Sequence, residues 1–292
     1  MRIAIVGPGR VGAALGCAFA AAGLDVLGYV GRDPARAAHA AEAVGGAALA
    51  LQDLGRAHVV AFCVGDEQLP AAIAAAAAVG GRRCSLWLHT SGRHGLEVLA
   101  PAAPLGVRRG VLHPVLPFGD AGTPPAALRD APAVLSGDAS SVRLMRRLCE
   151  RLGLAAIVCG EQDRGLYHAG LALAANGLTA LSSAAIDLVV RAGGLDDAAA
   201  TTIVTTLQQQ ALRAVREHGA ARALSGPVRR GDAATVGLHV ARLTASAPEL
   251  LPAYAATMQL ALRLAERQGL DAARVAAVRQ ALGHVAAEDS SP

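Results

Sequence analysis

Three glycines near the N-terminus have the spacing of a phosphate-binding turn. Gly7, Gly9 and Gly12 follow an apolar run from residue 2 to 6 and precede an alanine-rich run from 13 to 22. In this pattern the first glycine permits a sharp turn, the second leaves room for a pyrophosphate, and the third lets a helix pack closely on the strand. Backbone N–H groups at the helix start then face the phosphates. The residues predicted to bind a dinucleotide here are Gly7, Pro8, Gly9, Arg10, Val11 and Gly12.

Arg32 and Arg36 indicate which dinucleotide binds. A site for NAD would place a carboxylate near the end of the second predicted strand to bind the ribose 2′-hydroxyl group. Asp33 is followed by Pro34, so we expect its carboxylate to cap the next helix instead. Arg32 and Arg36, with Arg10 as a third candidate, can then grip a 2′-phosphate. The sequence therefore favours NADPH as the cofactor, although Arg36 could instead be a solvated helix residue.

Several candidate residues follow the ends of later strands. Val64 ends one predicted strand, and Gly65 follows it where the chain would pass beneath the cofactor. Ser91 follows the next strand and His113 follows a third. Ligands in open α/β sheets bind beyond the carboxyl ends of the strands, so we expect Ser91 to contact nicotinamide or substrate and His113 to face the cleft. For Ser91, capping of the following turn is an equally good interpretation.

His168 and Asn176 are polar residues on one apolar predicted helix. In a regular α-helix, residues with this spacing of eight lie about 12 Å apart along the axis and within roughly a quarter turn of each other. Both could therefore line one side of a cleft, with His168 in a catalytic or substrate-binding role. A histidine on an apolar helix can instead be a core residue, but Asn176 is a second group that is costly to bury.

A candidate anion site lies in a predicted loop in the second half of the chain, between residues 223 and 232. Arg229 and Arg230 come just before Asp232, which is well placed to cap a helix that runs to Ser246. Two arginines before a helix start suit a substrate carboxylate, and we assign this role to Arg230.

The elements that position these residues change character near Gly160. Strands and helices alternate before this point, as in a mostly parallel α/β sheet, and only helices follow it. The predicted strands are 2–6, 25–30, 58–64, 85–89, 107–112, 133–136 and 155–159. The predicted helices of the second half are 163–192, 196–218, 232–246, 248–268 and 271–286. We therefore predict a dinucleotide-binding domain at 1–160 and an all-α substrate and dimerisation domain at 161–292.

Composition excludes several classes of function. The 292 residues include 27 basic residues, all of them arginine, so no lysine-based mechanism is available. The net charge is +4, but the arginines are scattered and only 2% of the residues are aromatic, so we expect no nucleic-acid partner. The five cysteines show no CxxC spacing, which indicates free thiols in the cytoplasm. No signal peptide is expected, because the first apolar run is only a strand long.

Neither a membrane span nor a metal site is expected. Residues 165 to 186 are uncharged and long enough to cross a membrane, but their histidine, asparagine and hydroxyl groups favour a helix buried within protein, partly by another subunit. His89, His113, His168 and His239 could converge on a metal, yet no pair of them has compact ligand spacing.

These motifs together resemble a known family of proteins that combine a Rossmann-like domain with a DUF2520 domain. The resemblance covers nearly the whole chain. Its motifs are the glycine-rich start, His89-Thr90-Ser91-Gly92, His113-Pro114, Tyr167-His168 with Asn176, and Ser225-Gly226-Pro227 with Arg230-Gly231-Asp232. The group looks like a branch of the 6-phosphogluconate dehydrogenase superfamily, which includes ketopantoate reductase and pyrroline-5-carboxylate reductase.

The resemblance implies a Rossmann domain followed by an all-α domain of the 6-phosphogluconate dehydrogenase type. It also implies a homodimer formed through the helical domain and a reaction in the cleft between domains. Several members use a lysine and an asparagine one turn apart on the first helix of the second domain. Asn176 matches the asparagine, but Ala172 stands at the lysine position, and His168 one turn further back is the available substitute.

We therefore expect an NADPH-dependent reductase of a small 2-oxo acid, with 2-dehydropantoate as the first substrate to test. His168, as an imidazolium, would protonate the group that receives hydride, Asn176 would orient the carbonyl, and Arg230 would hold the carboxylate. His113 is the alternative acid. Reduction of a pyrroline-carboxylate imine is the second possibility, and an NADP(H)-binding sensor without turnover, which the missing lysine favours, is the third.

Overall fold

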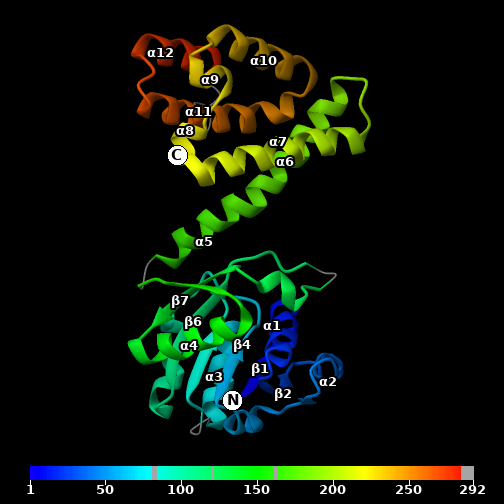
Figure 1. Cartoon of the computed structure of the whole chain (residues 1–292), viewed down its shortest axis with the longest axis vertical. Coiled ribbons are helices and arrows are strands. Elements are labelled where there is room, and N and C mark those ends of the chain that lie inside the picture. The colour runs from blue at the N-terminus through cyan, green and yellow to red at the C-terminus, as the bar shows by residue number, and fades with distance from the viewer. Residues whose placement is uncertain (81–83, 120–121, 161–162, 284–292) are drawn as a thin grey trace, which may run out of the picture. The chain divides into compact units, whose positions relative to one another are not determined.

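The computed structural model describes residues 1–80, 84–119, 122–160 and 163–283 (Figure 1). The chain divides into two compact units, Met1–Ala175 and Asn176–Pro292. This division lies later than the boundary expected after residue 160. The reason is that helix α5 (Arg164–Ala172) is attached to the sheet of the first unit, because Arg164 and Tyr167 form hydrogen bonds with strand residues.

The first unit is built on a mostly parallel sheet, as predicted. Within the described residues, eight strands pair in the order β3-β2-β1-β4-β5-β6-β7-β8, and only β6 and β7 are antiparallel neighbours. Each predicted strand is present; the short β3 was not predicted, because two residues show no periodicity. The strands are β1 (Arg2–Val6), β2 (Asp25–Val30), β3 (Ala47–Ala48), β4 (Val59–Phe62), β5 (Leu86–His89), β6 (Arg108–Pro114), β7 (Pro132–Gly137) and β8 (Ala155–Val158).

Helices cover both faces of this sheet. Alternate residues of β1 enter different core clusters, Ile3 and Ile5 on one face and Ala4 and Val6 on the other. The first cluster includes residues of α1 (Arg10–Ala21), α2 (Pro34–Glu42) and α4 (Ala139–Leu152), and the second includes residues of α3 (Leu69–Val79). Burial on both faces explains why these strands read as continuous apolar runs instead of alternating ones.

Aspartate side chains cap the N-terminal ends of six of the described helices. Asp33 accepts hydrogen bonds from the backbone of Ala35 and Arg36 at the start of α2, and Asp232 accepts one from Thr235 at the start of α10 (Ala233–Ser246). Both caps were predicted and are confirmed. Asp163 and Asp196 cap α5 and α7 (Asp197–His218) in the same way.

The long helix predicted from 163 to 192 is present but irregular. It consists of α5, a π-helical turn at Leu173–Gly177 and α6 (Leu178–Arg191). Asn176 lies within the π turn, so the regular-helix spacing expected between His168 and Asn176 is wrong. A π turn inserts a residue into the helical repeat, and such turns are frequent at functional sites.

The second unit is helical throughout its described residues. The segment expected to be a loop between 223 and 232 contains a five-residue helix, so that expectation is wrong. Residues 284–286 of the last predicted helix lie outside the described residues. The remaining helices are α8 (Ala220–Ala223), α9 (Gly226–Arg230), α11 (Leu251–Arg267) and α12 (Ala272–Ala281). A core cluster joins α9 to α12 through Val228, Val236, Leu262, Val275, Val278 and Leu282.

The helix from Arg164 to Arg191 contains a long apolar window. Its mean hydropathy reaches 1.5 over a window of which 0% is buried, and by length and composition alone it could cross a membrane. Leu173 and Leu181 are among its exposed side chains. The expected burial of this helix involves another subunit, so it stays a prediction.

Candidate functional site

The turn between β1 and α1 has the geometry that the glycine spacing predicts. Gly7 has a φ of +106°, and a Cβ atom there would lie 2.7 Å from Cγ1 of Val64. A Cβ on Gly12 would lie 2.0 Å from the carbonyl oxygen of Gly7, so α1 packs directly on the turn. At Gly9 the nearest atom to such a Cβ is 4.0 Å away. The turn is therefore filled around Gly7 and Gly12 and open at Gly9, as a cradle for a pyrophosphate requires.

The other predicted cofactor residues surround this turn in the first unit. Val64 and Gly65 follow β4, which pairs in parallel with β1, so they lie at the same edge of the sheet as the turn. Arg32 and Arg36 are exposed beyond the end of β2, while Oδ1 of Asp33 accepts the two amide protons that begin α2. The carboxylate after β2 therefore has the structural role that the sequence predicts.

Ser91 has the capping role, one of the two interpretations of the sequence. Its hydroxyl group donates to Oδ1 of Asp66 at 2.6 Å and accepts from the backbone N–H groups of Arg93 and His94, each at 3.1 Å. Because its proton is already donated to Asp66, the Ser91 hydroxyl group has none to give to a ligand.

His89, directly before this turn, is a buried structural residue. Its Nδ1 accepts the N–H of Ser91 at 3.2 Å, so its other nitrogen carries the proton and donates to the carbonyl of Gly95 at 3.0 Å. Burial lowers the pKa of His89 to about 4. The neutral ring therefore fixes the turn after β5.

His113, at the end of β6, lies against Tyr167 of α5. Its Nδ1 is 2.9 Å from the Tyr167 hydroxyl oxygen, and the two rings meet edge to face. Burial is the main cause that lowers the pKa of His113 to about 4, with smaller contributions from Arg164 and His168. His113 is thus neutral near pH 7, which favours His168 over His113 as the acid.

His168 and His113 meet at Gly92, after the end of β5. A Cβ atom on Gly92 would lie 2.8 Å from Nε2 of His113 and 3.2 Å from Cδ2 of His168. Only glycine leaves room for both rings at this position. The structure therefore brings together three of the segments singled out in the sequence: the turn after β5, the end of β6 and the first helix after the sheet.

Tyr167 and Arg164 complete this group, and neither was a predicted site residue. Arg164 is 8% exposed, donates from Nη2 to the hydroxyl group of Ser136, and has its Cζ 5.5 Å from the centre of the Tyr167 ring. Burial raises the pKa of Tyr167, and Arg164 partly offsets this effect. The sequence does contain one indication of this pair. Arg164 and Tyr167 are three residues apart on one predicted helix, which places both side chains on one face.

Asn176 and Arg230 belong to the second unit. Asn176 is exposed within the π turn, and Arg230 is the exposed last residue of α9. Near Arg230, hydrogen bonds from Thr235 are the main cause that lowers the pKa of Asp232, with a smaller effect of Arg230. His239 contacts the Tyr254 hydroxyl group through Nδ1 at 2.8 Å.

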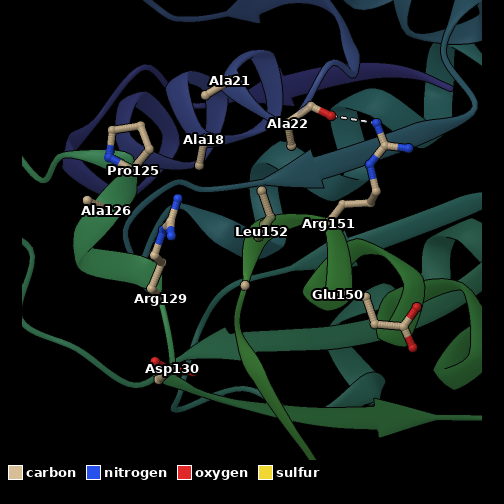
Figure 2. A pocket seen from close by; sticks show the side chains of 11 residues that line it. Ala18, Ala21, Ala22, Pro125, Ala126, Arg129, Asp130, Glu150, Arg151 and Leu152 are labelled. Atoms are coloured by element: carbon tan, nitrogen blue, oxygen red, sulfur yellow. Dashed lines mark hydrogen bonds between the residues drawn. The ribbon is translucent and has the colours of Figure 1, made fainter.

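Among the described residues, neither a group of metal ligands nor the surface pocket shown in Figure 2 adds to this site. In the part of the chain that the structure describes, no three histidine, cysteine or acidic side chains form a group that could hold a metal ion. A pocket of about 470 Å³ lies at the C-terminal end of α1, against Arg129 and the end of α4 (Figure 2). Arg151 spans part of it by donating to the carbonyl of Ala22. This pocket contains none of the predicted site residues.

Family models match both halves of the chain. Residues 1–114 match the Rossmann-like domain, and residues 131–261 match a domain of unknown function, DUF2520. No curated protein matches the chain.

Solved structures share the fold at low sequence identity. A Bacteroides fragilis protein described as a candidate NADP oxidoreductase is 17% identical with a TM-score of 0.68, covering 96% of this chain and 98% of its own. The Thermotoga maritima protein TM1727 is 20% identical with a TM-score of 0.68, and the match covers 91% of this chain and 99% of TM1727. A reductive aminase from Aspergillus terreus, in complex with NADPH and ethyl-5-oxohexanoate, is 19% identical with a TM-score of 0.57, covering 97% and 92%.

Proposed function

We propose that this chain, which combines a Rossmann-like domain with a DUF2520 domain, is an NADPH-dependent reductase of small acids that carry a carbonyl or imine group. The observation that carries this proposal is the arrangement of the parallel strands. The open turn at Gly9 follows β1, and His113 ends β6, with β4 and β5 between them. Three strand intervals correspond to about 14 Å, which suits an extended dinucleotide lying across the strand ends.

We assign separate roles in cofactor binding and proton transfer to residues of the first unit. Backbone N–H groups at the start of α1 bind the pyrophosphate over Gly9. His168, exposed beside Gly92, donates the proton to the oxygen or nitrogen of the group that is reduced, whereas the neutral His113 is not the acid. NADPH would supply the hydride. For Asn176 and Arg230, the roles of orienting the carbonyl and holding the carboxylate stay predictions.

NADPH is proposed over NADH because of the residues that follow β2. Arg32 and Arg36 are exposed there, and the nearby Asp33 carboxylate caps α2. Two guanidinium groups favour a 2′-phosphate, since they form charge-assisted hydrogen bonds with it. The NADPH complex of the structurally similar reductive aminase and the candidate NADP oxidoreductase support this choice.

The experiment first measures NADPH and NADH binding to the whole chain by calorimetry. NADPH oxidation is then followed with 2-dehydropantoate, other 2-oxo acids and a cyclic imine of the pyrroline-carboxylate type. We expect His168→Ala to slow hydride transfer by about 10²–10⁴-fold without changing NADPH affinity, while the exposed His39→Ala leaves both unchanged.

Each outcome of this experiment decides between functions. Oxidation with the cyclic imine alone would favour the imine reductase, for which the reductive aminase fold is the supporting comparison. Saturable NADPH binding without oxidation by any compound would favour a sensor. If neither dinucleotide binds, the proposal fails.

We further propose that the chain forms a homodimer through its helical unit and acts in the cytoplasm. Exposed apolar side chains on α6 and α7 support a partner of the same kind, because a single chain leaves them in water. The cysteines are free thiols in the structure, as suits a reducing compartment.

A further inference from the structure

Arg164 is a buried cation without a matching anion. Its side chain is 8% exposed, and Nε is enclosed without any hydrogen-bond partner. Its hydrogen bond from Nη2 goes to the neutral hydroxyl group of Ser136, which in turn donates to the carbonyl of Cys159 at 3.0 Å. Among the described residues, no carboxylate forms an ion pair with Arg164. A guanidinium group in this position has lost most of its water and gained no opposite charge in return.

The field of this cation acts on the neighbouring site residues. Arg164 lowers the pKa of His89 and of His113, and it opposes the burial that raises the pKa of Tyr167. The two histidines therefore bring no positive charge, and the tyrosine brings no negative one. None of these three side chains carries a negative charge that could pair with Arg164.

The backbone around Arg164 also favours an anion. Arg164 is the first residue of α5, whose N-terminal end carries the positive pole of the helix. The Asp163 carboxylate is engaged there as a cap, accepting the N–H of Leu166 at 2.9 Å. Because Asp163 already caps the helix end, the observation that points to an anionic ligand is the buried, incompletely bonded guanidinium group.

We propose that Arg164 binds the carboxylate group of the ligand, with the reacting carbon held beside Tyr167, His113 and His168. In a 2-oxo or 2-imino acid the reducible carbon is bonded directly to the carboxylate. Binding the carboxylate at Arg164 therefore brings that carbon to the side chains that meet at Gly92. The inference rests on the proposed function for this substrate class.

The test compares carboxylates with a neutral analogue in the full chain. The probes are acetate, oxalate, 3-methyl-2-oxobutanoate and the methyl ester of the last, and the readout is the shift in thermal unfolding followed by Trp87 fluorescence. Trp87 is the single tryptophan of the chain and is fully buried in the first unit. We expect the carboxylates to raise the unfolding temperature and the ester to leave it unchanged.

Variants assign the effect to Arg164. We expect Arg164→Met and Arg164→Gln each to weaken carboxylate binding at least tenfold, while the exposed Arg143→Gln binds as the wild type does. Without ligand, Arg164→Met should be no less stable than the wild type, because it removes an uncompensated buried charge and keeps the volume. If Arg164 had only a structural role, the Arg164→Met variant would be less stable than the wild type.

Several results would overturn this assignment. They are the absence of any carboxylate-induced shift in the wild type, a shift that survives in either Arg164 variant, and weaker NADPH binding in these variants, which would assign Arg164 to a cofactor phosphate. If carboxylates bind through Arg164 but neither dinucleotide binds, the anion site stands and the proposed reductase fails, so the two failures can be told apart.

Discussion

At the scale of single residues, Gly9 and Gly12 belong to one turn but serve different purposes. A Cβ on Gly12 would collide with the backbone of Gly7, whereas the same atom on Gly9 would enter open space. We expect Gly12→Ala to lower the free energy of unfolding of the first unit by about 3 kcal/mol. Gly9→Ala should change it by no more than about 0.5 kcal/mol and still weaken NADPH binding at least tenfold, because the methyl group takes the place of the pyrophosphate.

Urea denaturation followed by Trp87 fluorescence, together with calorimetry of NADPH binding, measures both quantities. A Gly9→Ala protein that binds NADPH as well as the wild type would contradict the placement of the pyrophosphate at this turn.

His89 and His113 predict how stability depends on pH. Both have pKa values lowered to about 4 in the folded chain, chiefly by burial. The unfolded chain, with histidines near pKa 6.5, then binds more protons than the folded one between pH 6.5 and 4. The stability of the first unit is therefore complete above pH 6.5 and falls as the pH drops through this window, by up to about 3 kcal/mol for each histidine.

Urea denaturation at several pH values between 7.5 and 4.5 checks this slope. We expect His113→Gln to reduce it and the exposed His39→Gln to leave it unchanged. Equal slopes in the wild type and in His113→Gln would show that His113 titrates normally.

At the scale of elements, the cap of α5 holds the site residues of that helix in place. Asp163 and Asp196 cap α5 and α7 through similar hydrogen bonds, to Leu166 at 2.9 Å and to Ala199 at 2.8 Å. We expect Asp163→Ala and Asp196→Ala each to cost about 1 kcal/mol of stability. Only Asp163→Ala should also slow NADPH oxidation, at least tenfold, because the first turns of α5 carry Arg164, Tyr167 and His168.

Steady-state rates and thermal unfolding of the two variants make this comparison. If both variants lose activity equally, the loss comes from lower stability, and the Asp163 cap does not position the site residues of α5.

The elements also show where sequence patterns stop being informative. The caps at Asp33 and Asp232 were predictable, because a cap depends on residues within one turn of each other. The π turn around Asn176 was not, because no periodicity in the sequence marks an inserted helical residue. The five-residue helix α9 was missed for a similar reason, since its glycine and proline are also typical of loops.

At the scale of the whole molecule, the exposed apolar side chains of α6 and α7 support self-association. Ile203 and Leu207 are one turn apart on α7 and are 48% and 66% exposed, and α6 packs beside α7 with its own exposed Leu181 (Figure 1). A closed dimer would bury such a surface against its own copy. We expect Leu207→Glu to convert a dimer into a monomer, because a dimer interface would then bury an unpaired charge.

Light scattering on a sizing column measures the mass of each variant. Leu238→Glu on α10 is the matched control, since Leu238 is 59% exposed but lies outside the α6 and α7 pair. A wild-type chain that is monomeric at micromolar concentration would refute the dimer.

The sequence by itself determined the features that depend on neighbours along the chain. The glycine turn, the alternation of strands and helices before residue 160, the helical second half and the aspartate caps all follow from local backbone geometry and apolar periodicity. For the same reason Ser91 and His113 could be placed near the sheet edge without any coordinates, whereas the sequence placed His168 only on a helix that lines a cleft.

Only the tertiary structure decided what those side chains do once they are there. The contact between His113 and Tyr167 joins residues 54 positions apart, and the hydroxyl group of Ser91 is taken by Asp66, 25 positions away. Burial of Arg164 and the neutral state of His113 depend on how completely distant segments exclude water. Exclusion of water is a property of the packed molecule, so no local pattern in the sequence could encode which charges it leaves unpaired.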